Sequence, residues 1–442
     1  MCLAQKCFAL DIVYPKKQDV VKNSSTTFFI GSSTEPLTVN GKNVELHKTG
    51  AFAYFVELNK GKNVFEFKTP TETKIYTVTH PNVKPRQLIK AKFIQQTPKS
   101  YRVKHDKTPL RTSPNNAGLN RITHLQKGTH LQVDGRLGSF YRVVLANDKK
   151  CWVFKDNVEP VNSNISFATV SGYDFLETDD YFAYIFHLDS QVPFEVNTGD
   201  LFQLKLYNVK DVINNTYIFE FPYREAMDTS KILGYSAEYD GNDFIWKIRK
   251  FPKVSKRQPL KNIIITVDAG HGGDEIGAIG CLGDKEKDVV LSISKFLKDE
   301  LESRGAKVVM TREGDEKVSL DDRVSITNTN DSMVFLSVHG NALPDTMDPN
   351  KHRGTSVYYY DDHSKLLGAN VLYSMVDKLG LPNDKLRQQS FAVIRNQQAL
   401  SLLIEVAYLI NPYDNELLID EKFQKRCAKA IADGIEEYFK GE

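Results

Sequence analysis

The stretch KNIIITVDAGHGG, residues 261–273, decides how the second half of this chain folds. It begins as an apolar run rich in β-branched residues, which is typical of a strand buried on both faces of a sheet. The run ends at Gly270 and His271 and enters a loop, so that five glycines lie within residues 266–280. A buried strand that opens into such a loop predicts an α/β layer with a site at the carboxyl end of the strand.

The sequence beyond this stretch continues the α/β pattern. Strands are expected in AKVVMTR, MVFLSVHGNA, TSVYYY and SLLIEVAYL. The segment EKDVVLSISKFLKDELESRG has one apolar face and predicts a helix that ends before Gly305. We also expect a helix that opens on Ser319 in SLDDRVSITNTN, and helices over 363–380 and 415–440. The pattern predicts a mixed central sheet with helices on both faces.

The chain before residue 258 has a different pattern, with short alternating runs separated by Gly, Asn, Asp and Pro. This part predicts small all-β domains ahead of the C-terminal α/β domain. The predicted divisions are a small antiparallel β-sandwich at 1–82, a β-barrel at 83–160, a β-rich module at 161–252, a linker at 253–261 and the α/β domain at 262–442.

Composition excludes some classes of function. The 442 residues carry a net charge of +2, which gives no reason to expect nucleic-acid binding. No apolar run is long enough to span a bilayer. The N-terminal stretch MCLAQKCFALDIVYPKK can be the trimmed end of a secretory signal but lacks its basic start. The five cysteines show no disulfide framework, and Cys281 is expected to be structural or incidental.

One region is strongly basic. Residues 83–130 contain eleven Lys and Arg residues and one Asp, a local charge of about +10. Two readings stay open. The region can bind a polyanion, or it can be a solvated face balanced by the acidic residues around 174–200.

Four residues have the chemistry of a metal site. His271 and His339 each end an apolar strand and each precede a glycine, and neighbouring strand ends of such a sheet converge. Glu286 opens the first helix, where an acidic residue is also favoured by the helix dipole. Glu405 lies inside SLLIEVAYLI, where an unpaired carboxylate is costly. It must be protonated, near a metal or paired, with Arg395 or Arg387 as the possible partner.

Together these residues indicate a zinc site with two imidazoles and one carboxylate as ligands, and with Glu405 as the group that carries the proton. The glycines at 270, 272 and 273 are expected to let the backbone turn so that His271 points at the metal. Other sites are excluded: Glu275 breaks G-x-G-x-x-G, and no G-x-x-x-x-G-K-[ST], serine elbow or H-E-x-x-H is present.

Six ordered motifs resemble a known family. TVDAGHGGDEIGAIG, EKDVVLSISKFLKDELESRGAKVVMTR, SLDDRVSITN, VFLSVHGNA, TSVYYY and SLLIEVAYLINPYDNELL resemble the zinc-dependent N-acetylmuramoyl-L-alanine amidases of bacterial walls. The resemblance implies one zinc ion held by His271, Glu286 and His339, Glu405 as the catalytic residue, and Arg395 and Asn341 beside the substrate.

The same resemblance implies a biological setting. The substrate would be peptidoglycan, cut between muramic acid and L-alanine by a periplasmic or secreted monomer of the cell envelope. Residues 24–80 resemble Ig-like modules, residues 98–160 resemble bacterial SH3-like barrels, and the third module faintly resembles wall-targeting modules. The basic region 83–130 would then meet anionic wall polymers.

The chain also departs from the family pattern. The segment GNALPDTMDPNKH, residues 340–352, is brief and polar where some members insert a helix that plugs the site, so we expect a site that is open without an activator. LRQQSFAVIRN differs from the family before a strand expected at VIRN. The alternative reading is a wall-binding or activator protein whose amidase-like domain is inactive. A zinc peptidase of another fold would need different ligand spacing.

Overall fold

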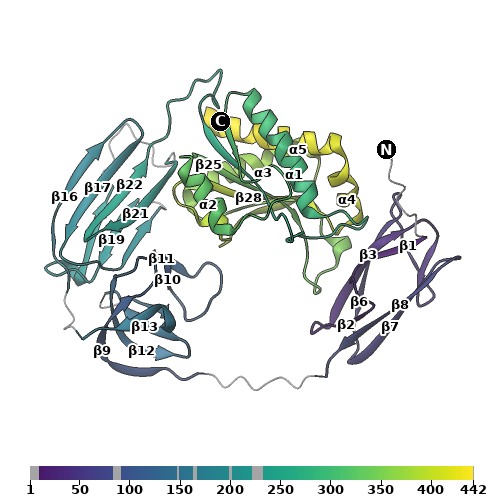
Figure 1. Cartoon of the computed structure of the whole chain (residues 1–442), viewed down its shortest axis with the longest axis horizontal. Coiled ribbons are helices and arrows are strands. Elements are labelled where there is room, and N and C mark those ends of the chain that lie inside the picture. Colours follow the sequence, from purple (N-terminus) through teal and green to yellow (C-terminus); the bar gives the residue numbers. More distant parts are fainter. Residues whose placement is uncertain are drawn as a thin grey trace.

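The computed structural model describes residues 9–82, 91–146, 149–162, 167–198, 202–221 and 232–441. Figure 1 shows an α/β unit between an N-terminal β unit on one side and two further β units on the other. This is the predicted fold class, in which all-β units precede a C-terminal α/β domain. No helix in the described ranges is both long and apolar enough to cross a membrane.

The N-terminal unit is a sandwich of two sheets that pack around Phe29, Phe52 and Phe67. It was expected to be wholly antiparallel, but one pair, β2 with β8, is parallel. The first sheet holds β1 (Leu10–Tyr14), β3 (Thr26–Ser33) and β6 (Ala51–Glu57); the second holds β2 (Asp19–Val21), β8 (Thr73–His80), β7 (Gly61–Lys68), β4 (Leu37–Val39) and β5 (Lys42–Val44).

The next unit is one antiparallel sheet of seven strands. In spatial order these are β11 (Arg121–Leu125), β10 (Thr108–Arg111), β14 (Lys150–Phe154), β13 (Phe140–Val144), β12 (His130–Leu137), β9 (Ile94–Val103) and β15 (Val158–Pro160), with the short helix η1 (Lys155–Asn157) before β15. Residues 83–90 of the predicted basic region lie outside the described residues.

The third unit has two antiparallel sheets with an aromatic core around Trp246. The strands are β16 (Val170–Glu177), β17 (Tyr181–Leu188), β22 (Asp243–Arg249) and β21 (Gly234–Asp240) in one sheet, and β18 (Phe194–Asn197), β19 (Gln203–Tyr207) and β20 (Thr216–Glu220) in the other, with η2 (Ile213–Asn215). One continuous apolar cluster runs from Val143 of the second unit to Phe244 of the third, so these two β units pack together. The boundary between them at residue 160 stays a prediction.

The α/β unit is built on a mixed six-stranded sheet. All neighbouring strands are parallel except β26 and β28. In spatial order the strands are β24 (Lys307–Met310), β23 (Ile264–Ala269), β25 (Val334–Asn341), β28 (Leu400–Tyr408), β26 (Thr355–Tyr359) and β27 (Asn383–Gln388). The predicted strands in 261–271, 306–312, 333–342, 355–360 and 401–409 are therefore present.

Helices cover both faces of this sheet. Four of them pack on the main apolar core, and α2 opens on Ser319, whose hydroxyl accepts a hydrogen bond from Asp322 N at 3.1 Å. The helices are α1 (Glu286–Ser303), α2 (Leu320–Thr329), α3 (Lys365–Leu379), α4 (Pro412–Ile419) and α5 (Glu421–Lys440), with the short helices η4 (Pro349–Lys351), η5 (Asp362–Ser364) and η6 (Val393–Arg395).

Two local predictions are wrong. The helix expected over 415–440 is two helices, because Asp420 has an extended backbone and its side chain caps α5. The strand expected at VIRN is the short helix η6, which buries Val393 and Ile394 against Phe335 and Leu403. The strand that precedes η6 in the chain is β27.

Candidate functional site

His271 lies at the sharp turn after β23. Its own φ is 61°, in the left-handed region that few non-glycine residues adopt. Gly272 and Gly273 follow with φ of 125° and 59°, which glycine adopts readily. Gly270 does not have positive φ, so the prediction that it helps the chain turn is wrong. Its role is steric, because a Cβ there would lie 2.4 Å from Cε1 of His339.

Two arginines hold this turn in place. Arg312 donates to the carbonyl oxygens of Ala269 and Gly270 at 2.9 and 2.8 Å. Arg323 of α2 donates to the carbonyl oxygens of Ala269 and His271 at 2.9 and 2.7 Å. Asp268, the residue before Ala269, forms a buried ion pair with Arg323. The unusual backbone of His271 is therefore fixed by charged hydrogen bonds.

Glu286 connects the two histidines. Its Oε1 lies 3.0 Å from Nε2 of His271 and 3.0 Å from Nδ1 of His339. Its other oxygen accepts a hydrogen bond from Ala278 N at 2.7 Å, and Gly340 N donates to Oε1 at 3.1 Å. Burial alone would raise the pKa of Glu286, but the contacts with the two imidazoles hold it well below its ordinary value.

His339 ends β25 directly beside the first strand. Its ring centroid is 4.9 Å from that of His271, and the rings are nearly perpendicular. Burial lowers the pKa of His339, but Glu286 and Glu405 raise it more, so the net pKa is above its ordinary value. The strand ends thus converge as the two apolar runs predicted.

Glu405 is paired in register with His339 across β25 and β28. Its Oε2 is buried and has no hydrogen-bond partner among the described residues. Burial raises the pKa of Glu405 to about 7; His339 opposes this rise and Glu286 adds to it. The salt bridge that was the alternative is absent within the described chain, since Arg387 pairs with Asp384 and Arg395 donates to Ser390.

The three donor residues can hold one metal ion. One ligand atom from each of His271, Glu286 and His339 lies within 4.8 Å of the others. Ligand atoms around a tetrahedral zinc ion are about 3.3 Å apart, given bonds of about 2.0 to 2.1 Å. The 3.0 Å spacings between the Glu286 oxygen and the two imidazole nitrogens fit this geometry. A nitrogen and oxygen donor set without thiolate suits zinc.

A pocket of about 450 Å³ opens over these residues. Asn341, at the end of β25, lines it together with Glu405, Arg323 and Phe391. Arg395 does not line this pocket; it lines an adjoining cleft. Of the two residues predicted to lie beside the substrate, the structure brings Asn341 close to the histidines and places Arg395 one cleft away.

Three residues of the site were not singled out from the sequence. Asp268, Arg312 and Arg323 are buried, and Arg312 also donates to Lys287 O at 2.8 Å. Asp268 could have been recognised in the sequence, because it is a charged residue inside the apolar run IIITVDA. The same feature identified Glu405. Cys281 is a buried thiol that donates to Ile410 O at 3.3 Å, in an apolar cluster with Phe28 of the N-terminal sandwich.

Known proteins are similar to this part of the chain. Residues 265–437 match the family described as N-acetylmuramoyl-L-alanine amidase. The probable cell wall amidase LytH of Staphylococcus saprophyticus is 35% identical over 189 residues, which are 42% of this chain and 62% of that protein. The uncharacterized protein YqiI of Bacillus subtilis is 30% identical over 192 residues, which cover 42% of this chain and 90% of that protein.

Solved structures resemble the same region. The N-acetylmuramoyl-L-alanine amidase AmiC2 of Nostoc punctiforme is 34% identical, with a TM-score of 0.38, and the match covers 42% of this chain and 98% of that one. The catalytic domain of CwlV from Bacillus (Paenibacillus) polymyxa is 32% identical, with a TM-score of 0.38, and the match covers 40% of this chain and 97% of that one. The chain spans about six tenths of the length of the LytH relatives that it matches.

Proposed function

The chain belongs to the N-acetylmuramoyl-L-alanine amidase family through its residues 265–437, and from this premise we propose that it is a zinc-dependent peptidoglycan hydrolase. The bond cut is the amide between the lactyl group of muramic acid and L-alanine. The observation that carries the proposal is the partly buried quartet, in which Glu286 bridges His271 and His339 while Glu405 stands unpaired in the adjacent strand.

Each residue of the quartet has a role in the proposed reaction. His271, Glu286 and His339 would hold the zinc ion, which when bound supplies Lewis-acid polarisation and lowers the pKa of a water. Glu405 accepts a proton from the attacking water as the oxygen bonds to the carbonyl carbon. The same carboxyl then delivers that proton to the alanine nitrogen as the carbon–nitrogen bond breaks. A pKa of about 7 suits a group that must both accept and donate.

The inactive alternative requires that part of this apparatus be lost. All three donor residues are present and lie together, and the proton carrier is positioned beside them. These facts favour an enzyme over a binding or activator protein. The β units would then localise the enzyme at the cell envelope, in the periplasm or outside the cell. We also propose that the first unit is Ig-like and the second SH3-like.

The test is digestion of purified peptidoglycan with the full-length protein, followed by mass analysis of the products. We expect free stem peptides that begin with L-alanine, and their loss on treatment with EDTA and in Glu405→Ala. Products cut elsewhere in the peptide, or activity that withstands EDTA, would refute the proposal.

A further inference from the structure

A second cleft lies where the second β unit meets the α/β unit. Its volume is about 590 Å³, and both units and the third β unit contribute to its lining. Leu320 and Ala392 line this cleft and the active-site pocket alike, so the two spaces adjoin. A substrate bound over Glu405 has room to extend into this cleft if it is longer than the pocket. We call this space the interunit cleft.

Three arginines gather at the interunit cleft. Arg121 and Arg395 line it, and Arg111 lies buried beside them. Burial lowers the pKa of both Arg111 and Arg395, and the nearby Arg121 guanidinium lowers each further. Among the residues that the structure describes, none of the three guanidinium groups lies within 4.0 Å of a carboxylate. Like charges this close repel unless an anion joins them.

Two of these side chains meet on one residue. Arg121, from β11, donates Nη1 to Ser390 Oγ at 2.8 Å, and Arg395, from η6, donates Nη1 to Ser390 O at 2.7 Å. The Nε of Arg121 is buried and has no hydrogen-bond partner in the described chain. An orphaned buried donor on a charged group is costly, so the guanidinium of Arg121 has fewer acceptors than it can use in the described chain.

The acidic residues of the interunit cleft form no ion pair with the three arginines in the described chain, although Asp321 partly opposes the lowering of the Arg395 pKa. Asp106, Glu238 and Asp321 line it, but all three side chains are exposed. Asp321 lies 3.7 Å from Lys107, and Asp106 accepts a hydrogen bond from the backbone of Lys127. The cleft thus has a cationic interior and a rim of mixed charge.

We propose that the interunit cleft is a subsite for a carboxylate of the peptide portion of the substrate, held by Arg121 and Arg395. This inference rests on the proposed function, because it takes the amide over Glu405 to belong to a peptidoglycan stem peptide. Such a peptide carries free carboxylates beyond the cut bond, whereas the N-acetylated sugars are neutral. Guanidinium groups bind carboxylates through paired hydrogen bonds, which gives both charge and orientation. The second β unit thereby contributes to recognition of the substrate.

The test compares two soluble muropeptides, one with its stem-peptide carboxylates free and one with them amidated. We expect full-length protein to prefer the free form by about 10- to 100-fold in kcat/KM, mainly through KM, as for the loss of charged hydrogen bonds. Arg121→Gln should remove most of this preference and leave the amidated substrate almost unaffected. Arg121→Lys should keep part of it.

A control variant separates the charge of this cleft from charge elsewhere on the same sheet. Arg102→Gln alters an arginine of that sheet that pairs with Glu159 and does not line the cleft. It should keep the preference. Equal cleavage of both substrates by wild type and by Arg121→Gln would overturn the proposed carboxylate subsite. The proposed amidase function would still stand.

If wild type cleaves neither substrate, the proposed function fails, and calorimetric binding of the same two muropeptides decides about the cleft. If wild type binds the free form more tightly and Arg121→Gln does not, the result would support the carboxylate subsite. Equal binding of the two muropeptides by wild type would overturn it.

Discussion

Glu405 is a carboxyl group that the fold holds where its charged form is costly. It stands in a nine-residue strand that is otherwise buried, beside His339 and with one oxygen enclosed and unpartnered. Burial of such a group without a partner disfavours its charged form. A residue kept there despite this cost is typical of an active site.

Substitution of this carboxyl should separate activity from stability. In Glu405→Gln we expect peptide release to fall by about 10²- to 10⁴-fold, the range typical of a lost general base. The thermal midpoint should stay the same or rise, because a neutral amide avoids the burial of an ionisable group. Activity within about tenfold of wild type would assign proton transfer to another residue.

Gly270 gives a test of the space around the metal ligands. Gly270→Ala places a Cβ 2.4 Å from the His339 ring, which must then shift from its place beside Glu286. We expect zinc affinity to fall on the order of 10- to 100-fold, as when the support of a ligand is lost. Competitive titration with a zinc chelator measures this. The control is Gly314→Ala, whose Cβ meets only the flexible end of Glu316; equal affinities in both variants would contradict the steric account.

The clustering of His271 with His339 could be predicted from the sequence, because polar residues at the ends of apolar strands are conspicuous. The residues that fix their geometry could not. Arg312 follows a strand and Arg323 lies on a helix whose sequence has weak apolar periodicity, so both resemble solvated charges. Only the tertiary structure turns them inward onto the carbonyl groups around His271.

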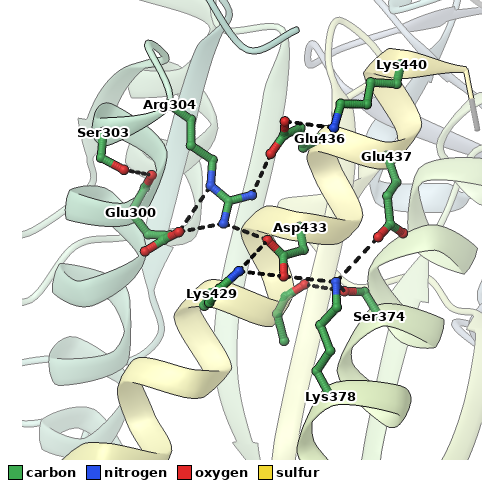
Figure 2. A network of polar contacts seen from close by, with 11 residues as sticks. Glu300, Ser303, Arg304, Ser374, Lys378, Lys429, Asp433, Glu436, Glu437 and Lys440 are labelled. Atoms are coloured by element: carbon green, nitrogen blue, oxygen red, sulfur yellow. Dashed lines mark hydrogen bonds and ion pairs between the residues drawn. The ribbon is translucent and has the colours of Figure 1, made fainter. Parts of the chain in front are cut away.

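At the scale of elements, charged contacts tie together the helices that cover one face of the central sheet (Figure 2). Arg304, just after α1, pairs with Asp433 at 2.6 Å and Glu436 at 2.8 Å, both on α5. Lys378 of α3 reaches the other oxygen of Asp433 at 2.9 Å. Asp433 therefore links three helices, and its cationic neighbours outweigh partial burial and lower its pKa to about 2.

This network predicts a defined pH dependence of stability. The pKa of Asp433 is depressed from about 3.9 in the unfolded chain, so its contribution is fully present above about pH 4 and is lost as pH falls through 2. Asp433→Asn should lower the free energy of unfolding by about 1 kcal/mol at pH 7, since the group is partly screened by solvent.

Urea unfolding at several pH values measures that effect. The difference between wild type and Asp433→Asn should shrink as the pH falls below about 4. Asp377→Asn, at an exposed position of α3, should differ little from wild type at any pH. A cost of Asp433→Asn that stays constant down to pH 2 would show that charge is not its cause.

The elements themselves were largely predictable, since apolar runs and helical periodicity mark the sheet and the helices around it. The failures are local. The apolar positions on both sides of Asp420 suit one long helix, and only the cap at that residue breaks it. In VIRN a short helix buries the two apolar residues Val393 and Ile394. So short an apolar pattern does not distinguish a helix from a strand.

At the scale of the whole molecule, the β units contact the α/β unit at several places, and the third unit does so through Tyr235 and Gln397. The second unit meets it at Arg121 and Ser390. The N-terminal sandwich holds the segment after β25, where Asp345 pairs with Lys22 at 2.7 Å and accepts a hydrogen bond from Thr27 at 2.9 Å. That segment has only the short helix η4, and no inserted helix lies in it.

These contacts predict that the full chain is active without a partner. Full-length protein should release peptides from purified peptidoglycan with no added activator, because the β units contact the borders of the site and leave the pocket open. The comparison is with a piece covering residues 258–442. Full-length protein that is inactive beside an active piece would make the β units inhibitors.

We propose that one metal ion at the His271, Glu286 and His339 group makes this chain an amidase. The most direct measurement is titration of metal-free full-length protein with Zn²⁺ while peptides beginning with L-alanine are released from peptidoglycan. We expect activity that rises to a plateau at one equivalent of Zn²⁺, and in Glu405→Gln one equivalent bound without activity. Release of peptides that needs no metal, or zinc binding unchanged in His339→Ala, would refute a catalytic metal at these residues.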